Sequence, residues 1–323
     1  MELNSSTMSD TETDKIFSRL EDRLGSRYLK RRMDIQKRYL LRRYPLSSRM
    51  NRKKIEPHYI CLRYLLMLSG LYNRARSNSV LYEIDDRITS FKNLPSGFHG
   101  FKILHLSDIH VEGIIDNGKK LTEIISGLEY DLCLMTGDYR FLTYTDYRPS
   151  MKLMEGIIAS AQCRYGVMGI LGNHDCIDMV PDLESFGMRI LINESVKLEN
   201  SSDRIWIAGV DEASLKCADI PKSLEDVPPE GFTVFLAHSP DLLKQAEAGG
   251  VCFYLCGHTH GGQICLPGRI PVITKTRRAR KYSRDSWEYK GMKGYTSAGT
   301  GASGLPVRLN CPPRITIHTL VKS

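Results

Sequence analysis

The sequence lacks an uninterrupted apolar stretch of about 18 residues, the shortest length that reads as a transmembrane helix. The best candidate, Tyr59–Tyr72, has 14 residues and contains Arg63, so it is predicted not to span a bilayer. The N-terminal segment, MELNSSTMSDTETD, is polar and acidic, which is not the pattern of a secretory signal. These absences predict a cytoplasmic protein that at most lies on a membrane surface.

A disulfide framework is missing as well. The nine cysteines are odd in number, form no CxxC pair and mostly lie within apolar runs. This usage is typical of reduced, buried thiols. With 323 residues, 41% of them hydrophobic and 25% charged, the chain has a globular composition and can bury a core without such cross-links.

Acidic residues are scarce in one segment. Between Arg23 and Lys54, thirteen Lys and Arg residues stand against the single acid Asp34, although the whole chain has a net charge of only +8. The excess of positive charge is therefore local. It indicates that this segment binds a partner, and it says nothing about the fold. We expect residues 15–75 to bind an anionic membrane surface through basic residues and an apolar segment. A solvated arm and weak nucleic-acid contact remain alternatives, and no specific nucleic acid is expected.

The pattern of apolar and charged residues divides the chain into a basic helical region, 1–80, and a domain, 81–323. Apolar residues recur at helical spacing between Lys15 and Leu41, which predicts one or two helices. Beyond Ile84, short apolar runs predict strands, and longer stretches between them predict helices. The predicted strands are Phe101–Leu106, Asp131–Thr136, Tyr165–Leu171, Arg189–Ile192, Ile205–Val210, Thr233–Ala237, Val251–Cys256, Gly294–Ser297 and Ile315–Leu320. The predicted helices are Gly118–Leu128, Ser150–Ala161, Val180–Phe186 and Pro240–Ala248. This alternation predicts a mixed α/β layered domain.

Five of these strands end in side chains of the types that can bind metals. The motifs are Asp108-x-His110, Asp138, Asn173-His174-Asp175, His238 and His258-x-His260. In a D-x-H or H-x-H pair that continues a strand, residues i and i+2 point to the same side, so both side chains can reach one point. Carboxylate, imidazole and amide ligands suit borderline divalent metals such as Mn, Fe or Zn.

Even seven of these side chains are too many for one ion, but they suit two ions about 3.5–4 Å apart. Two metals at this separation clamp the attacking and leaving oxygens of a displacement at phosphorus, and they lower the pKa of bound water. The remaining histidines, His58, His99, His105 and His318, lie outside the pattern and receive no role.

The ordered motifs D-x-H, G-D, G-N-H-D, H and G-H-x-H resemble the calcineurin-like metallophosphoesterases over roughly residues 95–320. The resemblance implies a two-sheet β-sandwich flanked by helices. It also implies that Asp108, His110, Asp138 and His260 hold a first metal. Asp138, Asn173, His238 and His258 would hold a second, with Mn²⁺ the expected ion and Fe or Zn as alternatives. His174 would be the catalytic histidine that assists the leaving oxygen, and Asp175 would orient it.

A narrower resemblance rests on LPSGFHGFKILHLSDIH, TGDYRF, LAHSPDLL, GHTHGGQICLPG and SGLPVRLNCPP. These segments are similar to a bacterial, membrane-associated branch that includes the chlamydial-type UDP-2,3-diacylglucosamine pyrophosphatase. The resemblance implies cleavage of a lipid-linked UDP-sugar to UMP and an acylated sugar phosphate in lipid A synthesis, on the inner face of the cell membrane. The wider family's G-D-x-x-D motif has Phe141 at its last position here.

Two alternatives stay open: a broad phosphodiesterase acting on nucleotides or other diesters, and a non-catalytic binding protein. The intact ligand set argues against the second.

Two further candidates concern the substrate. Arg140, just after Asp138, is a candidate contact to a substrate phosphate. The segment Arg269–Lys293 carries nine Lys and Arg residues against two acids and is either a border of the site that attracts an anionic head group or a solvated loop.

Overall fold

Short, fully apolar strands form the centre of the first sheet. In this computed structural model, which describes residues 18–43, 57–143, 145–272 and 280–323, four of them pair in parallel: β2 (Phe101–Leu106), β3 (Leu132–Met135), β4 (Val167–Gly169) and β5 (Met188–Ile190). Nearly all their side chains are buried, as expected for parallel strands that are covered on both faces. β14 (Arg314–Lys322) pairs antiparallel with β2, and β1 (Glu83–Phe91) pairs parallel with β14 at the edge.

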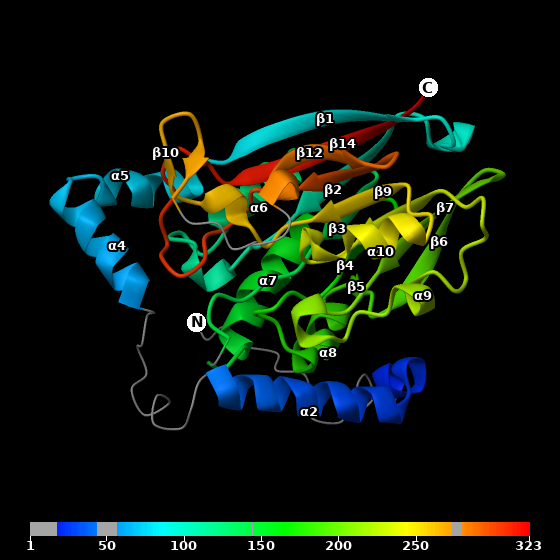
Figure 1. Cartoon of the computed structure of the whole chain (residues 1–323), viewed down its shortest axis with the longest axis horizontal. Coiled ribbons are helices and arrows are strands. Elements are labelled where there is room, and N and C mark those ends of the chain that lie inside the picture. Colours follow the sequence, from blue (N-terminus) through cyan, green and yellow to red (C-terminus); the bar gives the residue numbers. More distant parts are fainter. Residues whose placement is uncertain (1–17, 44–56, 144, 273–279) are drawn as a thin grey trace, which may run out of the picture.

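A second six-stranded sheet packs on the first (Figure 1). Its order is β12 (Asp285–Tyr289), β13 (Met292–Thr296), β9 (Phe253–Cys256), β8 (Thr233–Leu236), β7 (Asp203–Gly209) and β6 (Glu194–Asn200). The four inner strands are mutually parallel, and the two edge strands are antiparallel to their neighbours. Side chains of both sheets, among them Ile103 and Leu255, form one apolar core between the layers.

Helices cover the outer faces of both sheets. The apolar sides of α6 (Lys119–Ser126), α7 (Arg148–Ser160) and α8 (Val180–Ser185) pack on the first sheet. α9 (Ile220–Ser223) and α10 (Leu243–Ala248) pack on the second. The predicted two-sheet sandwich flanked by helices is therefore confirmed. The predicted strands and helices occur within two residues of their expected ends, except that Pro240–Ala248 begins with a 3-10 turn and is α-helical only from Leu243.

The strands that the sequence pattern missed are mainly edge strands. Charged residues interrupt the apolar pattern of these strands: exposed ones such as Lys197 and Glu288 in β6 and β12, and Asp85, Asp86 and Arg87 in β1. A search for apolar runs does not detect them. The small hairpin of β10 (Cys265–Leu266) and β11 (Ile270–Pro271) is too short to give a periodic signal.

The basic N-terminal region contains α2 (Ser26–Arg43), α4 (Pro57–Leu68) and α5 (Tyr72–Ser77). α2 lies against the domain near α8, whereas α4 and α5 lie at a different side of the molecule (Figure 1). Leu29 of α2 is buried in the main core, and Arg32 forms a fully buried ion pair with Asp211 at 2.6 Å. None of the helices in the described ranges has the length and apolar character needed to cross a bilayer.

Candidate metal centre

Five loops meet at one edge of the sandwich, and each follows the carboxyl end of a parallel strand. They come after β2, β3 and β4 of the first sheet and β8 and β9 of the second. The loops bring together the predicted residues Asp108, His110, Asp138, Asn173, His174, Asp175, His238, His258 and His260. Six of these residues are buried, while Asn173, His174 and His258 are half-buried and form the open side of the centre.

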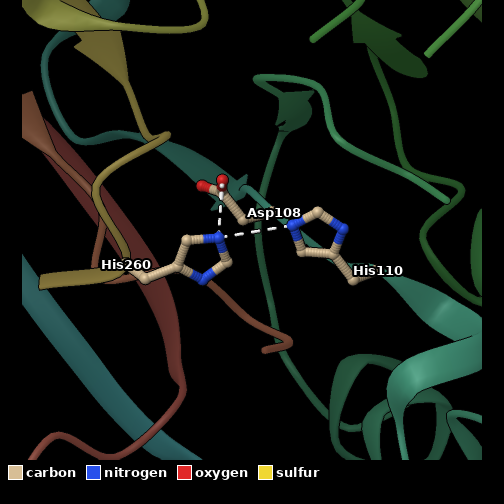
Figure 2. A group of neighbouring side chains, drawn as sticks. All are labelled: Asp108, His110 and His260. Atoms are coloured by element: carbon tan, nitrogen blue, oxygen red, sulfur yellow. Dashed lines mark hydrogen bonds and ion pairs between the residues drawn. The ribbon is translucent and has the colours of Figure 1, made fainter. Parts of the chain in front are cut away.

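The first group of ligand-type side chains joins Asp108 and His110 with His260, which lies 150 residues further along the chain (Figure 2). Nε2 of His260 is 3.3 Å from Oδ1 of Asp108 and 3.3 Å from Nε2 of His110. Three electron-pair donors from two different sheets therefore face one point.

Asp138 lies between this group and a second one. Its Oδ2 is 3.5 Å from Nε2 of His110 and 3.4 Å from Nε2 of His238. Nδ1 of His258 and Oδ1 of Asn173 each lie 3.1 Å from the same His238 nitrogen. The carboxylate of Asp138 is thus shared between two clusters, as the bridging role predicted for it requires.

Backbone carbonyls fix the tautomers of two histidines. Nδ1 of His110 donates to the carbonyl of Arg140, and Nδ1 of His238 donates to that of Thr136, both at 2.8 Å. In a neutral ring this leaves the Nε2 lone pair directed into the cluster, which is how metal-binding imidazoles are held. The facing Nε2 atoms of His110 and His260, 3.3 Å apart, can share either a proton or a metal ion between their lone pairs.

The charges of the cluster also favour a cation. Burial alone would raise the pKa of Asp138, but the nearby His238, followed by His174 and His110, holds it well below its usual range. For His238, burial lowers the pKa, yet the Asp138 carboxylate outweighs burial and raises it well above the ordinary value. The donor set and its electrostatics fit divalent metals of the Mn, Fe or Zn type.

The backbone of the ligand loops differs from the strand geometry that the spacing argument used. Asp108, His110, Asp138, His258 and His260 all have positive φ values, between 45° and 70°. Non-glycine residues rarely occupy this region, and such strain is typical of functional sites. Asp108 and His110 therefore share a target because their loop turns tightly, and the alternation of an extended strand is not the reason.

Two motif glycines allow the loops to approach each other. A Cβ at Gly172 would clash with the carboxylate of Asp138 and the ring of His238. A Cβ at Gly257 would clash with Ser107 and the carboxylate of Asp108. Any side chain at either position would push the ligand loops apart, so glycine is required by packing.

Asp175 has different partners from those predicted. Its carboxylate accepts hydrogen bonds from the backbone amides of Asp138, Tyr139 and Gly172, at 2.7, 2.9 and 2.8 Å. Nδ1 of His174 instead lies 2.9 Å from the carbonyl of Phe141. The expectation that Asp175 orients the imidazole is thus corrected: Asp175 holds the loops that follow β3 and β4, and burial followed by the charge of Asp138 raises its pKa to about 7.

Arg140 also has a different role from the predicted contact to a substrate phosphate. The side chain is buried, and its guanidinium donates to the carbonyls of His174, Thr143 and Thr145. These bonds attach the loop after Asp138 to the loop that carries His174. Because the donors are committed to backbone carbonyls, Arg140 acts as a structural cation.

Sequence reasoning missed a second buried arginine. Arg308 donates to the carbonyls of Gly299 and Gly301 and, at 3.3 Å, to that of His260. Burial lowers its pKa. It stabilises the loop of a ligand histidine from behind. The only available signal was an arginine between apolar residues after a glycine-rich stretch, which does not specify this contact.

Comparison with known proteins agrees with this geometry. The family model for calcineurin-like phosphoesterases matches residues 101–262. The chain is 26% identical to the uncharacterized metallophosphoesterase YkoQ of Bacillus subtilis, over 81% of this chain and 98% of that protein. It is 27% identical to the phosphodiesterase YaeI of Escherichia coli, over 68% and 82% of the two chains.

Among solved structures, TT1561 of Thermus thermophilus aligns with a TM-score of 0.44 and 10% identity, over 62% of this chain and 89% of that one. The family match covers half of the present sequence and includes all five ligand loops. The chain therefore belongs to the calcineurin-like phosphoesterases and is a metal-dependent hydrolase.

Proposed function

We propose that this hydrolase cleaves the pyrophosphate of UDP-2,3-diacylglucosamine, giving UMP and 2,3-diacylglucosamine 1-phosphate for lipid A synthesis, at the cytoplasmic face of the inner membrane. The observation that carries the proposal is the position of α4. Tyr59 and Leu62 of this helix line a small cavity of about 30 Å³ together with His260. An apolar helix beside a metal-ligand loop suits a substrate that has acyl chains close to its phosphates.

The metal ligands are assigned from the motifs that this chain shares with its family, and His174, which also groups with His110 and Asp138, is kept as the proton donor. Asp108, His110, Asp138 and His260 would hold one ion, and Asp138, Asn173, His238 and His258 would hold the other, with Mn²⁺ as the proposed native metal. When bound, such ions stabilise negative charge on phosphoryl oxygens and lower the pKa of water.

His174 is the proposed proton donor. In the reaction, the oxygen of a water molecule adds to phosphorus, the bond from that phosphorus to the bridging oxygen breaks, and the leaving oxygen acquires a proton. The backbone N–H of His174 donates to Oδ1 of Asp138 at 2.8 Å, and its Nδ1 is held by Phe141. Nε2 is therefore the nitrogen that we assign to proton transfer, on the half-buried side of the centre.

The test is UMP release from UDP-2,3-diacylglucosamine in mixed micelles with Mn²⁺, beside hydrolysis of bis-p-nitrophenyl phosphate. His174→Ala should keep its metal content and lose about 10²–10⁴-fold in rate. The control is His99→Ala, an exposed histidine that precedes β2, at the opposite end of this strand from Asp108, and it should behave as wild type. Loss of metal from His174→Ala, or wild-type turnover, would contradict the assigned role.

A broad phosphodiesterase is the second candidate, and the similarity to the phosphodiesterase YaeI favours it. The two candidates differ in their need for acyl chains. Rapid cleavage of the lipid with poor turnover of the small diester supports the lipid substrate. Turnover of the small diester alone keeps a phosphodiesterase and removes the lipid substrate.

A further inference from the structure

One face of α4 is apolar and exposed, although the opposite face is packed on the domain. Leu66 is buried with Ile264, Leu305 and Val307, which fixes the inner face of the helix. The outer residues are large and apolar: Ile60, Tyr64, Leu65, Met67 and Leu68, with Leu68 86% exposed. Hydrophobic side chains on this scale are normally exposed singly, and a contiguous group indicates an interaction surface.

The hairpin next to α4 extends this surface. Ile264 directly precedes β10 and packs in the same apolar cluster as α4, so the hairpin adjoins the helix. Three of the hairpin's apolar side chains, Leu266, Ile270 and Val272, are about half exposed. We call these three residues and the outer residues of α4 the apolar rim.

The charged residues within the two segments that carry the apolar rim are all basic. Residues 57–80 contain Arg63, Arg74 and Arg76 and no acid. Residues 266–281 contain six Lys and Arg residues and no acid. Apolar side chains framed by cations are the composition of a helix that lies in the interface of an anionic bilayer.

α2 does not offer such a surface, although it is the more basic helix. Leu20, Leu24 and Leu29 in and beside α2 are buried against the domain. Its outer face carries mainly charged residues, such as Lys30 and Arg38. Of the residues 15–75 that were expected to bind a membrane, residues 15–17 and 44–56 lie outside the described part of the chain, and among the described ones α4 is the helix with an exposed apolar face.

We propose that the apolar rim inserts into an anionic lipid surface and holds the metal centre against it. A groove of about 200 Å³ runs along the rim, lined by Tyr59, Ile60, Arg63, Tyr64, Met67 and Leu305. Tyr59 also lines the cavity beside His260, so the groove on the rim lies next to that cavity. The biological purpose of inserting the apolar rim into lipid rests on the proposed lipid substrate, but binding to vesicles can be measured without turnover.

The experiment is co-sedimentation of the full chain with vesicles of phosphatidylcholine and phosphatidylglycerol at about 3:1. The test variant is Leu65→Glu/Leu68→Glu on α4. The matched control is Met33→Glu/Leu41→Glu, which makes the same charge change at two exposed apolar residues of α2. Hydrolysis of bis-p-nitrophenyl phosphate reports the fold and the metal centre in each protein.

Wild type and control should bind the vesicles equally. The affinity of the α4 variant for the vesicles should be at least about tenfold lower, because two apolar side chains no longer enter the bilayer. All three proteins should cleave the small diester at the same rate. Binding should weaken at about 0.5 M salt and with pure phosphatidylcholine. Equal binding by the α4 variant, or no binding by wild type at low salt, overturns the assignment. The assignment is also overturned if the wild type forms an oligomer that the α4 variant does not form, and neither protein binds vesicles.

Discussion

The role of Asp175 in holding the ligand loops can be tested with Asp175→Asn. The carboxylate accepts from four buried backbone amides: those of Asp138 and Gly172 at Oδ2, and those of Tyr139 and, at 3.5 Å, Arg140 at Oδ1. Asparagine has one acceptor oxygen, and its NH₂ group must face at least one of these N–H groups. A buried donor left without an acceptor costs about 1–3 kcal/mol.

The cost is expected in metal binding, because two of the amides belong to Asp138 and Gly172, which directly precedes Asn173. Loss of a group that orients metal ligands typically lowers metal affinity about 10–100-fold. Calorimetric titration of metal-free protein with Mn²⁺ measures this affinity. Activity is measured in parallel at saturating Mn²⁺.

The control is Asp178→Asn, which makes the same chemical change three residues later, where the carboxylate accepts from Gln36 of α2 at 2.8 Å. This variant should bind Mn²⁺ as wild type does. Unchanged affinity in Asp175→Asn would refute the loop-holding role. If the turnover number also fell at saturating metal, the result would restore a direct action of Asp175 on His174.

Three other perturbations test the centre and its frame. Asp138→Ala should abolish both tight Mn²⁺ binding and turnover, since its carboxylate faces both clusters, and metal analysis together with a diesterase assay would show any retained activity. Arg32→Met should lower the free energy of unfolding in urea by about 3–5 kcal/mol, because the Asp211 carboxylate would stay buried without its cation. The control is Arg31→Met, at an exposed arginine. An equal loss of unfolding free energy in the two variants would contradict a stabilising role of the buried ion pair. Burial, followed by the charge of His105, holds the pKa of His318 well below its usual range of about 6.5. Folding therefore loses up to about 1.4 kcal/mol per pH unit as the pH falls below about 6.5, where the unfolded chain takes up a proton that the folded chain does not. His318→Phe should flatten this acid limb in urea titrations at pH 7 and 5, and an unchanged slope would count against the explanation.

His318 is suited to that test because its ring sits between the sheets. It contacts Phe253 and Tyr295 of the second sheet, and neither ring nitrogen has a hydrogen-bond partner in the described part of the chain. Phenylalanine can occupy the same space without losing a polar contact. His105 and His318 are thus core residues, in agreement with their exclusion from the predicted site.

Much of the frame could be predicted from the sequence, because its signals are local. A parallel strand covered on both faces must be apolar throughout, so β2, β3, β8 and β9 appear as short apolar runs. Ligands that follow such strands also appear as fixed motifs, because the loops are short. The mixed α/β class and the residues that meet at the centre follow from these patterns, whereas the two-sheet sandwich was implied by the family that the motifs resemble.

The tertiary structure alone decided which partner each polar side chain has. Asp175 and Arg140 stand beside the motif residues in sequence, yet their bonds go to backbone groups of neighbouring loops, and only the packing of those loops places the donors and acceptors. The same holds for the basic N-terminal region: the buried Asp211 determines that α2 joins the domain, and the cluster around Ile264 determines which face of α4 stays outside. Residues far apart in the chain supply those contacts, so no local pattern in the sequence could specify them.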